Sequence, residues 1–206
     1  MKILLINGSP RSSGCTFRAL CEIERELKNE SVSTEIFQIG ANAISGCRGC
    51  GYCRENKKCV VDDSVNSFAQ TAAKADGFIF GSPVHYAAAS GGITAFMDRL
   101  FYSSSYALEY KPAAAIISCR RGGASAAFDQ LNKYFTINNM PIVSSQYWNM
   151  VHGNTPEEVE KDLEGLQIMR TLGKNMAWLL KSIEAGAKAG IAYPKKEEKV
   201  KTNFIR

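Results

Sequence analysis

The sequence has no apolar run long enough to cross a membrane, and its first apolar stretch, residues 3–6, is too short for the core of a signal peptide. It also has no block of five Lys or Arg residues, and the net charge of +5 is spread along the chain. We therefore expect a cytoplasmic protein that binds neither membranes nor nucleic acid. Its 206 residues, 45% of them hydrophobic, are enough for one good core and predict one domain.

The cysteines do not form a pattern that predicts a disulfide framework. Their number, seven, is odd, and four of them fall within thirteen residues: Cys47, Cys50, Cys53 and Cys59. In a reducing compartment such a group is typical of metal ligands or free thiols. We call residues 43–63, which contain these four, the cysteine loop.

Strand patterns and helix patterns alternate along the rest of the chain, with no internal repeat. Apolar or alternating runs predict strands at residues 2–6, 32–38, 77–80, 113–118 and 142–145, with Gly81, Ser82 and Pro83 ending the third. Helical spacing predicts helices at residues 16–28, 65–74, 93–101 and 126–137, and one long helix from Pro156 onward. The alternation predicts an α/β fold with a doubly wound five-stranded parallel sheet and helices on both faces, formed by residues 1–190 and followed by a C-terminal tail at 191–206.

The segment between the first strand and the first helix, residues 8–16, has the composition of a phosphate loop. It is not a Walker A loop, because five residues separate Gly8 from Gly14 and Cys15 replaces the lysine. It is not a dinucleotide fingerprint either, because Pro10 replaces the second glycine. The alternative is an ordinary strand-to-helix turn capped by Ser or Thr.

The hydroxyls, the guanidinium and the backbone N–H groups of the phosphate loop converge on a helix N-terminus, which favours an anion. A single terminal phosphate fits this cradle, and flavin mononucleotide (FMN) is the leading candidate. The predicted binding residues are Ser9, Arg11, Ser12, Ser13, Gly14, Cys15 and Thr16.

Two further loops follow strands and should reach the same edge of a parallel sheet, where ligands bind at the switch in strand order. In residues 82–92, Pro83 and Val84 offer an apolar surface and Tyr86 a stacking face, while His85 is either solvated or beside the flavin. Residues 119–124, the arginine loop, could place a cation near the N1 edge of the ring, unless its arginines are solvated. The predicted residues there are Arg120, Arg121, Gly122 and Gly123.

Together these motifs resemble the NADPH-dependent FMN reductase branch of the flavodoxin-like superfamily. The resemblance rests on residues 8–16, on residues 82–86, and on Gly92 followed by Asp98 and Arg99, and it extends over almost the whole chain. It implies the sheet order 2-1-3-4-5, FMN at the three loops, and a homodimer or homotetramer in which a neighbouring subunit helps to close the flavin site. One departure is Cys15, which stands where many relatives have asparagine.

The cysteine spacing, Cys47-x2-Cys50-x2-Cys53-x5-Cys59, is similar to the compact motif of the iron–sulfur flavoproteins. In those proteins the motif holds a [4Fe–4S] cluster, because closely spaced thiolates can wrap one cubane. Two alternatives remain open: free thiols with no cluster, and a zinc site, although structural zinc usually has two cysteine pairs separated by a longer span.

The expected function is that of an FMN-dependent NAD(P)H oxidoreductase, which passes a hydride to the flavin and electrons to a second acceptor such as free flavin, a quinone or a protein. No catalytic side chain is predicted, because the flavin carries the chemistry. The rivals are an iron–sulfur flavoprotein that carries electrons and, from another class, a non-catalytic zinc-binding module.

Overall fold

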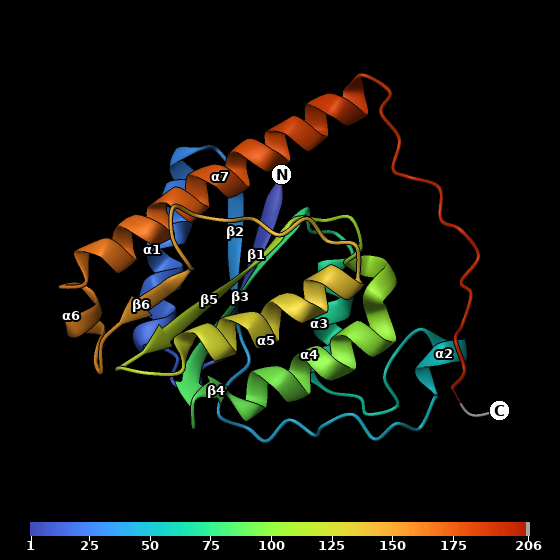
Figure 1. The fold of residues 1–206 in the computed structure, drawn as a ribbon, viewed down its shortest axis with the longest axis horizontal. Helices are drawn as coiled ribbons and strands as arrows, with labels where there is room; N and C mark the ends of the chain where they lie inside the picture. Colours follow the sequence, from blue (N-terminus) through green and yellow to red (C-terminus); the bar gives the residue numbers. More distant parts are fainter. Residues whose placement is uncertain (205–206) are drawn as a thin grey trace.

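The computed structural model describes residues 1–204 and consists of a central parallel sheet between two layers of helices (Figure 1). The strand order is β2-β1-β3-β5-β6, and every pair along this path is parallel. The strands are β1 (Lys2–Asn7), β2 (Ser33–Gln38), β3 (Gly77–His85), β5 (Ala113–Cys119) and β6 (Met150–His152). The short β4 (Ala88–Ala89) folds back antiparallel on β3, and we call residues 82–92, which contain this turn, the hairpin loop. With β4 set aside, this is the predicted order 2-1-3-4-5.

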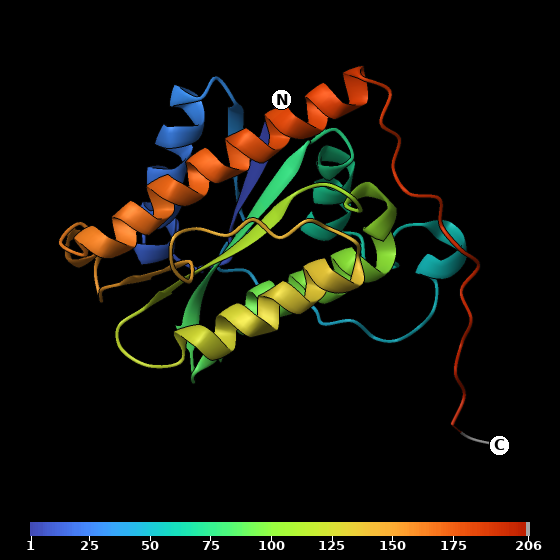
Figure 2. The ribbon, with the colours of Figure 1, turned by 45° about the horizontal axis from the view of Figure 1, so that its top comes forward.

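The helices divide between the two faces of the sheet (Figure 2). On one face lie α1 (Cys15–Asn29) and α7 (Leu163–Lys188), and on the other lie α3 (Ser64–Ala72), α4 (Gly91–Ser104) and α5 (Ala124–Ile137). Three short helices complete the described elements: α2 (Cys53–Asn56), the 3₁₀ helix η1 (Ser105–Ala107) and α6 (Pro156–Val159). The doubly wound arrangement is therefore confirmed.

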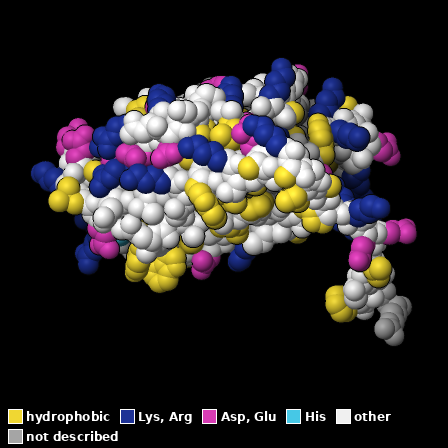
Figure 3. All heavy atoms as spheres, turned by 90° about the horizontal axis from the view of Figure 1, so that it is seen from above, with side chains coloured by type: hydrophobic (Ala, Val, Ile, Leu, Met, Phe, Trp, Pro, Cys, Tyr) yellow, Lys and Arg dark blue, Asp and Glu magenta, His cyan; other side chains and the backbone are white. Residues whose placement is uncertain are grey.

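The central strands β1, β3 and β5 are buried on both faces because most of their positions are apolar, whereas the edge strand β2 is polar at several positions and only partly buried. In β1, Ile3 and Leu5 join the core under α1 and α7, whereas Leu4 and Ile6 join the core under α3, α4 and α5. This split follows from the strand geometry, in which successive side chains point to opposite faces. On the face covered by α7, basic and acidic side chains are interspersed (Figure 3). Within residues 1–204, no helix combines the length and the apolar character that a membrane crossing needs.

Two predicted strand boundaries were wrong. Gly81, Ser82 and Pro83 do not end β3, because β5 continues to pair with all three of them. The strand predicted at 142–145 makes only one isolated bridge, from Ile142 to Ala113, and the edge strand is β6 further along the chain. The intervening segment turns toward α7 instead, because Ser145 donates a hydrogen bond to the carbonyl of Ile168.

The long helix predicted from Pro156 is broken into α6 and α7. Asp162 interrupts it, since its carboxylate accepts from the N–H groups of Gly165, at 2.9 Å, and His152, at 2.6 Å, and so caps a new helix. The helical spacing that predicted this helix persists in α7, where Leu166, Met169 and Leu172 are buried, although Leu163 at its first position is exposed.

Candidate functional site

The phosphate loop is held from beneath by two polar side chains at strand ends. Asn7 is fully buried; its Oδ1 accepts from the Ser9 N–H at 3.1 Å and its Nδ2 donates to the Arg11 carbonyl at 3.2 Å. Gln38, at the end of β2, donates to the Ser9 carbonyl at 2.7 Å and accepts from Asn7. These bonds are all internal to the protein and fix the loop's shape, so the loop is preorganised.

Gly8 is the point where the phosphate loop touches the hairpin loop. Its N–H donates to the Gly81 carbonyl at 2.8 Å, and its carbonyl accepts from the Ser90 hydroxyl at 3.0 Å. A Cβ at this position would lie 2.6 Å from the Gly81 oxygen and 2.8 Å from the Cβ of Ile93. Glycine is therefore required by close packing, and the loops that follow β1 and β3 are joined.

The exposed side chains of the phosphate loop face a cleft of about 370 Å³. Its walls include Arg11, Ser12 and Ser13 on one side and residues 154–156 on the other. Helix α1 begins at this cleft after Gly14; no side chain caps it and no acidic residue stands in its first turn. Its first N–H groups and its dipole are therefore available to an anion.

Besides Ser9, whose buried Oγ accepts from the Arg11 N–H at 3.1 Å, two residues of the phosphate loop turn their side chains inward. The Thr16 hydroxyl lies 2.8 Å from the Ser118 hydroxyl, and Thr16 is buried. The Cys15 thiol donates to the Gly153 carbonyl at 3.6 Å, and burial raises its pKa. Both side chains were expected to contact the phosphate. In this geometry the backbone N–H groups of these residues, and not their side chains, are available for that contact.

The hairpin loop and the arginine loop also meet. Strands β3 and β4 pair through Val84 and Ala89, and the turn between them carries two residues with positive φ, Tyr86 and Ala87. Gly123, with φ +94°, packs so closely on Ala87 that a Cβ there would lie 2.5 Å from the Ala87 Cα. The three predicted loops thus lie at one edge of the sheet, the edge formed by the carboxyl ends of β1, β3 and β5.

The predicted ring-binding residues line the surface of this edge. Pro83 and Val84 are half-buried, and Tyr86 is fully exposed. His85 borders a second cleft of about 300 Å³ between the phosphate loop, residues 39–44 and residues 90–92. On the other side Arg120, Arg121 and Gly122 are exposed.

The four cysteines of the cysteine loop line one cavity of about 360 Å³. Cys47 and Cys50 are exposed, and Cys53 and Cys59 are partly buried. The donors match four-thiolate ligation in type and number, and Arg48, Arg54 and Arg99 border the same cavity. The sulfurs are not gathered, however: among residues 1–204 no three His, Cys, Asp or Glu side chains form a ready metal site.

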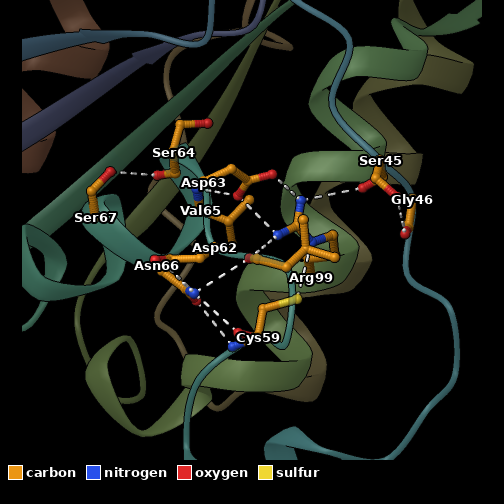
Figure 4. Close-up of polar contacts among 11 residues, drawn as sticks. Ser45, Gly46, Cys59, Asp62, Asp63, Ser64, Val65, Asn66, Ser67 and Arg99 are labelled. Carbon is orange, nitrogen blue, oxygen red and sulfur yellow. Dashed lines mark hydrogen bonds and ion pairs between the residues drawn. The ribbon is translucent and has the colours of Figure 1, made fainter.

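A buried arginine joins the cysteine loop to α4 (Figure 4). Arg99 is 1% exposed and pairs with Asp63 through both nitrogens of its fork, at 2.6 and 2.8 Å. Asp63 also caps α3 by accepting from the Val65 N–H at 3.0 Å. The remaining N–H groups of Arg99 reach the cysteine loop, including the Cys59 sulfur at 3.2 Å.

The Arg99–Asp63 pair shifts both pKa values toward the charged forms. Burial alone would raise the pKa of Asp63, but the hydrogen bonds from Arg99 and from the Val65 N–H, with the Arg99 charge, lower it. The hydrogen bond to Asp63 is the main cause that raises the pKa of Arg99, against the effect of burial. Both groups are therefore ionised at neutral pH.

No site role was predicted for four residues that shape these sites: Asn7, Gln38, Ser90 and Arg99. Polar residues at the ends of apolar strands were one available signal, since Asn7 and Gln38 close two of them. The other was an arginine beside the apolar stripe formed by Ile93, Phe96 and Leu100. A charge there needs a buried partner.

The fold and the three adjoining loops define a flavodoxin-like α/β protein. A flavodoxin from the domain Archaea superposes with a TM-score of 0.61 at 16% identity, covering 88% of this chain and 99% of that one. RosB, solved with 8-demethyl-8-formylriboflavin-5′-phosphate bound, superposes with a TM-score of 0.70 at 13% identity, covering 100% and 92%. At these identities the likeness concerns the fold.

The family follows from the sequence comparisons. The family model described as NADPH-dependent FMN reductase matches residues 1–155, and the chain belongs to that family. An iron–sulfur flavoprotein of Methanocaldococcus jannaschii is 30% identical over 192 residues, which are 89% of this chain and 100% of the relative.

Proposed function

We propose that this protein is an FMN-dependent NAD(P)H oxidoreductase that passes electrons to a second acceptor. The observation that carries the proposal is the junction of the phosphate, hairpin and arginine loops at one edge of the sheet, in a chain of the FMN reductase family. Bound FMN would supply a two-electron acceptor for the nicotinamide hydride and a donor to free flavin, a quinone or a protein.

The residues proposed to hold FMN divide by the part of the ligand that they serve. Arg11, Ser12, Ser13 and the N–H groups that open α1 are placed for the phosphate. Pro83, Val84, His85 and Tyr86 would contact the ring on one side, with Arg120, Arg121, Gly122 and Gly123 on the other. A cation near the pyrimidine edge favours the anionic reduced flavin.

The absorbance spectrum of the purified protein tests this proposal first. Flavin bands that bleach on addition of NADH or NADPH are expected, and the ratio of the two rates identifies the preferred nicotinamide. A protein that binds no flavin when titrated with FMN would overturn the proposal.

A second function, that of an iron–sulfur flavoprotein electron carrier, is favoured by one specific observation. All four cysteines of the compact motif line a single cavity, and the relative from Methanocaldococcus jannaschii is an iron–sulfur flavoprotein. We propose a [4Fe–4S] cluster on Cys47, Cys50, Cys53 and Cys59, which would make single-electron transfer to a carrier available. This function adds to the flavin site and does not replace it.

Anaerobic expression followed by iron, sulfide and zinc analysis distinguishes the alternatives. About four irons per chain are expected in the parent, with a large loss in Cys53→Ser. Cys21→Ser, which changes a half-buried thiol in α1, is the matched control and should keep its iron. Zinc in place of iron would support the non-catalytic zinc module, and neither metal would leave a flavin-only reductase.

The assembly and the compartment are part of the proposal. Exposed aromatic residues before the edge strand, Tyr147 and Trp148, are consistent with a homodimer or homotetramer. The seven free cysteines suit the reducing cytoplasm. Light scattering of the purified protein tests the assembly, and a monomeric mass at micromolar concentration would reject it.

A further inference from the structure

Arg99 is the largest fully buried side chain of the described chain, and each of its five N–H groups has an acceptor. Two go to the carboxylate of Asp63. The other bonds go to the Val61 carbonyl at 2.8 Å, the Ser45 carbonyl at 3.4 Å and the Cys59 sulfur at 3.2 Å. A guanidinium with so complete a set of partners has a fixed position (Figure 4).

The two carbonyls that Arg99 binds belong to opposite ends of the cysteine loop. Ser45 stands two residues before the first cysteine of the motif, and Val61 stands two residues after the last. One side chain of α4 therefore joins the two ends of the motif and removes much of the entropy cost of closing that segment.

Cys59 is held more firmly than the other cysteines of the motif. Asn66 accepts from its N–H and donates to its carbonyl, both at 3.0 Å, so the backbone is fixed while Arg99 fixes the sulfur. Within residues 1–204, the sulfurs of Cys47 and Cys50 have no hydrogen bond and both residues are exposed. The motif thus has one preorganised sulfur and others that are free to move.

We infer that Arg99 is a positioning residue for the four-cysteine site: it joins the ends of the motif and holds the Cys59 sulfur as the preorganised ligand. This inference rests on the proposed iron–sulfur function. A donor and a positive charge beside a ligand sulfur stabilise the more negative, reduced state of a cluster, so Arg99 also raises its reduction potential.

The test uses Arg99→Lys, which keeps the charge but has no planar fork to serve Asp63, two carbonyls and a sulfur together. The control is Arg25→Lys, which makes the same change at an exposed arginine of α1, outside the cysteine cavity. After anaerobic reconstitution, Arg99→Lys should lose iron to a chelator about 10–100-fold faster than the parent. Its cluster potential should also be more negative. The control should match the parent in both measurements.

A measurement on the metal-free protein tests whether Arg99 holds the cysteine loop in place. Trypsin can cut the cysteine loop after Arg54, Lys57 or Lys58, and cutting in the metal-free protein should be several-fold faster in Arg99→Lys. Asp63→Asn is the second variant; asparagine caps a helix as well as aspartate does, so α3 keeps its cap while Arg99 loses its ionic partner. Circular dichroism verifies that each variant is folded.

The outcomes separate the inference from the proposed function. Faster iron loss, a lower potential and faster cutting in Arg99→Lys, with Asp63→Asn shifted the same way in cutting, would support the inference. A parent that binds iron, with both variants unchanged in iron loss, potential and cutting, would overturn the inference alone. A parent that takes up no iron under anaerobic conditions would overturn the iron–sulfur function and, with it, this role of Arg99.

Discussion

The phosphate loop and the cysteine loop solve the same problem, the fixing of a segment without regular structure, in opposite ways. The phosphate loop is bonded along its length, by Asn7 and Gln38 from beneath and by Gly8 against β3. The cysteine loop is held near its ends, by Arg99 and Asn66, and its middle is exposed. The first suits a ligand that enters a finished cradle, and the second suits a ligand around which the chain closes.

The largest effect is expected when the hold on the cysteine loop is removed. Arg99→Ala leaves Asp63 without its ionic partner and three loop acceptors without a donor, which should lower the free energy of unfolding by about 3 kcal/mol, the lower end for a broken buried pair because Asp63 is partly exposed. Urea denaturation measures the loss. Arg54→Ala, at an exposed position, should change stability by less than about 0.5 kcal/mol. Equal stability of the two variants would contradict the anchoring role.

The next effect concerns the close packing of the phosphate loop. Gly8→Ala places a methyl group against the Gly81 oxygen and Ile93, and should destabilise the protein by about 1–3 kcal/mol. In Gly92→Ala the new Cβ meets no atom within 4 Å, so this control should stay near the parent. Thermal denaturation compares the two. If Gly8→Ala is as stable as its control, the junction of the phosphate and hairpin loops is looser than the distances imply.

The next, smaller effect concerns the affinity of the preorganised phosphate loop for FMN. Asn7→Ala removes two bonds to the loop's backbone, and FMN affinity should fall about tenfold, corresponding to roughly 1.4 kcal/mol. Fluorescence titration with FMN measures it. Asn29→Ala, at an exposed position at the end of α1 far from the loop, is the control. Unchanged affinity in Asn7→Ala would mean that FMN itself imposes the loop's shape.

The cysteine loop should also respond to acid, because the pKa of Asp63 is lower in the folded protein than in the unfolded chain. Burial opposes this shift, but the Arg99 hydrogen bond and charge and the Val65 N–H outweigh it. The stability that Asp63 contributes is therefore complete above its unfolded pKa and is lost as pH falls through the folded value. Trypsin is not active in acid, so cutting of the cysteine loop below about pH 4 is measured with pepsin.

Asp63→Asn supplies the comparison for that titration. In the parent, pepsin cutting within residues 43–63 should accelerate as pH falls. In the variant, cutting should be faster than in the parent, and its rate should depend less on pH. The same slope in both proteins would assign the acid response to other carboxylates.

The sequence predicted a larger part of the fold than of the contacts that shape the candidate site. Apolar periodicity identified the strands that lie in the centre of the sheet, because burial on both faces leaves a continuous apolar run in β1, β3 and β5. The edge strand was misplaced because both 142–145 and β6 are short and apolar. Their contacts with α7, such as that of Ser145 with Ile168, decided which of them pairs, and these contacts are distant in sequence.

In the candidate site, the predicted residues were those that a local motif contains. The phosphate loop was visible because its hydroxyls and glycines are consecutive, and the cysteines because their spacing is compact. Gln38 and Arg99 act across 29 to 54 residues of sequence. Only the folded chain shows what such residues touch. The inward turn of Thr16 has the same origin, since its partner Ser118 lies 102 residues away.

The smallest effect is expected at the arginine loop, because its guanidinium groups are exposed, in contrast to the buried guanidinium of Arg99. Arg120 and Arg121 are exposed, so water and salt screen their charges, and each should contribute no more than about 1 kcal/mol to a nearby anion. Replacing both with glutamine should make the midpoint potential of bound FMN slightly more negative, and the difference should shrink as ionic strength rises. A double variant of two exposed lysines in the C-terminal tail, Lys195→Gln with Lys199→Gln, removes the same charge and should leave the potential unchanged. The measurement is a redox titration of the three proteins at low and at high salt. Equal midpoint potentials at low salt would mean that neither arginine acts on the ring. A shift in potential that persists at high salt would mean that the bound ligand buries one of the two arginines.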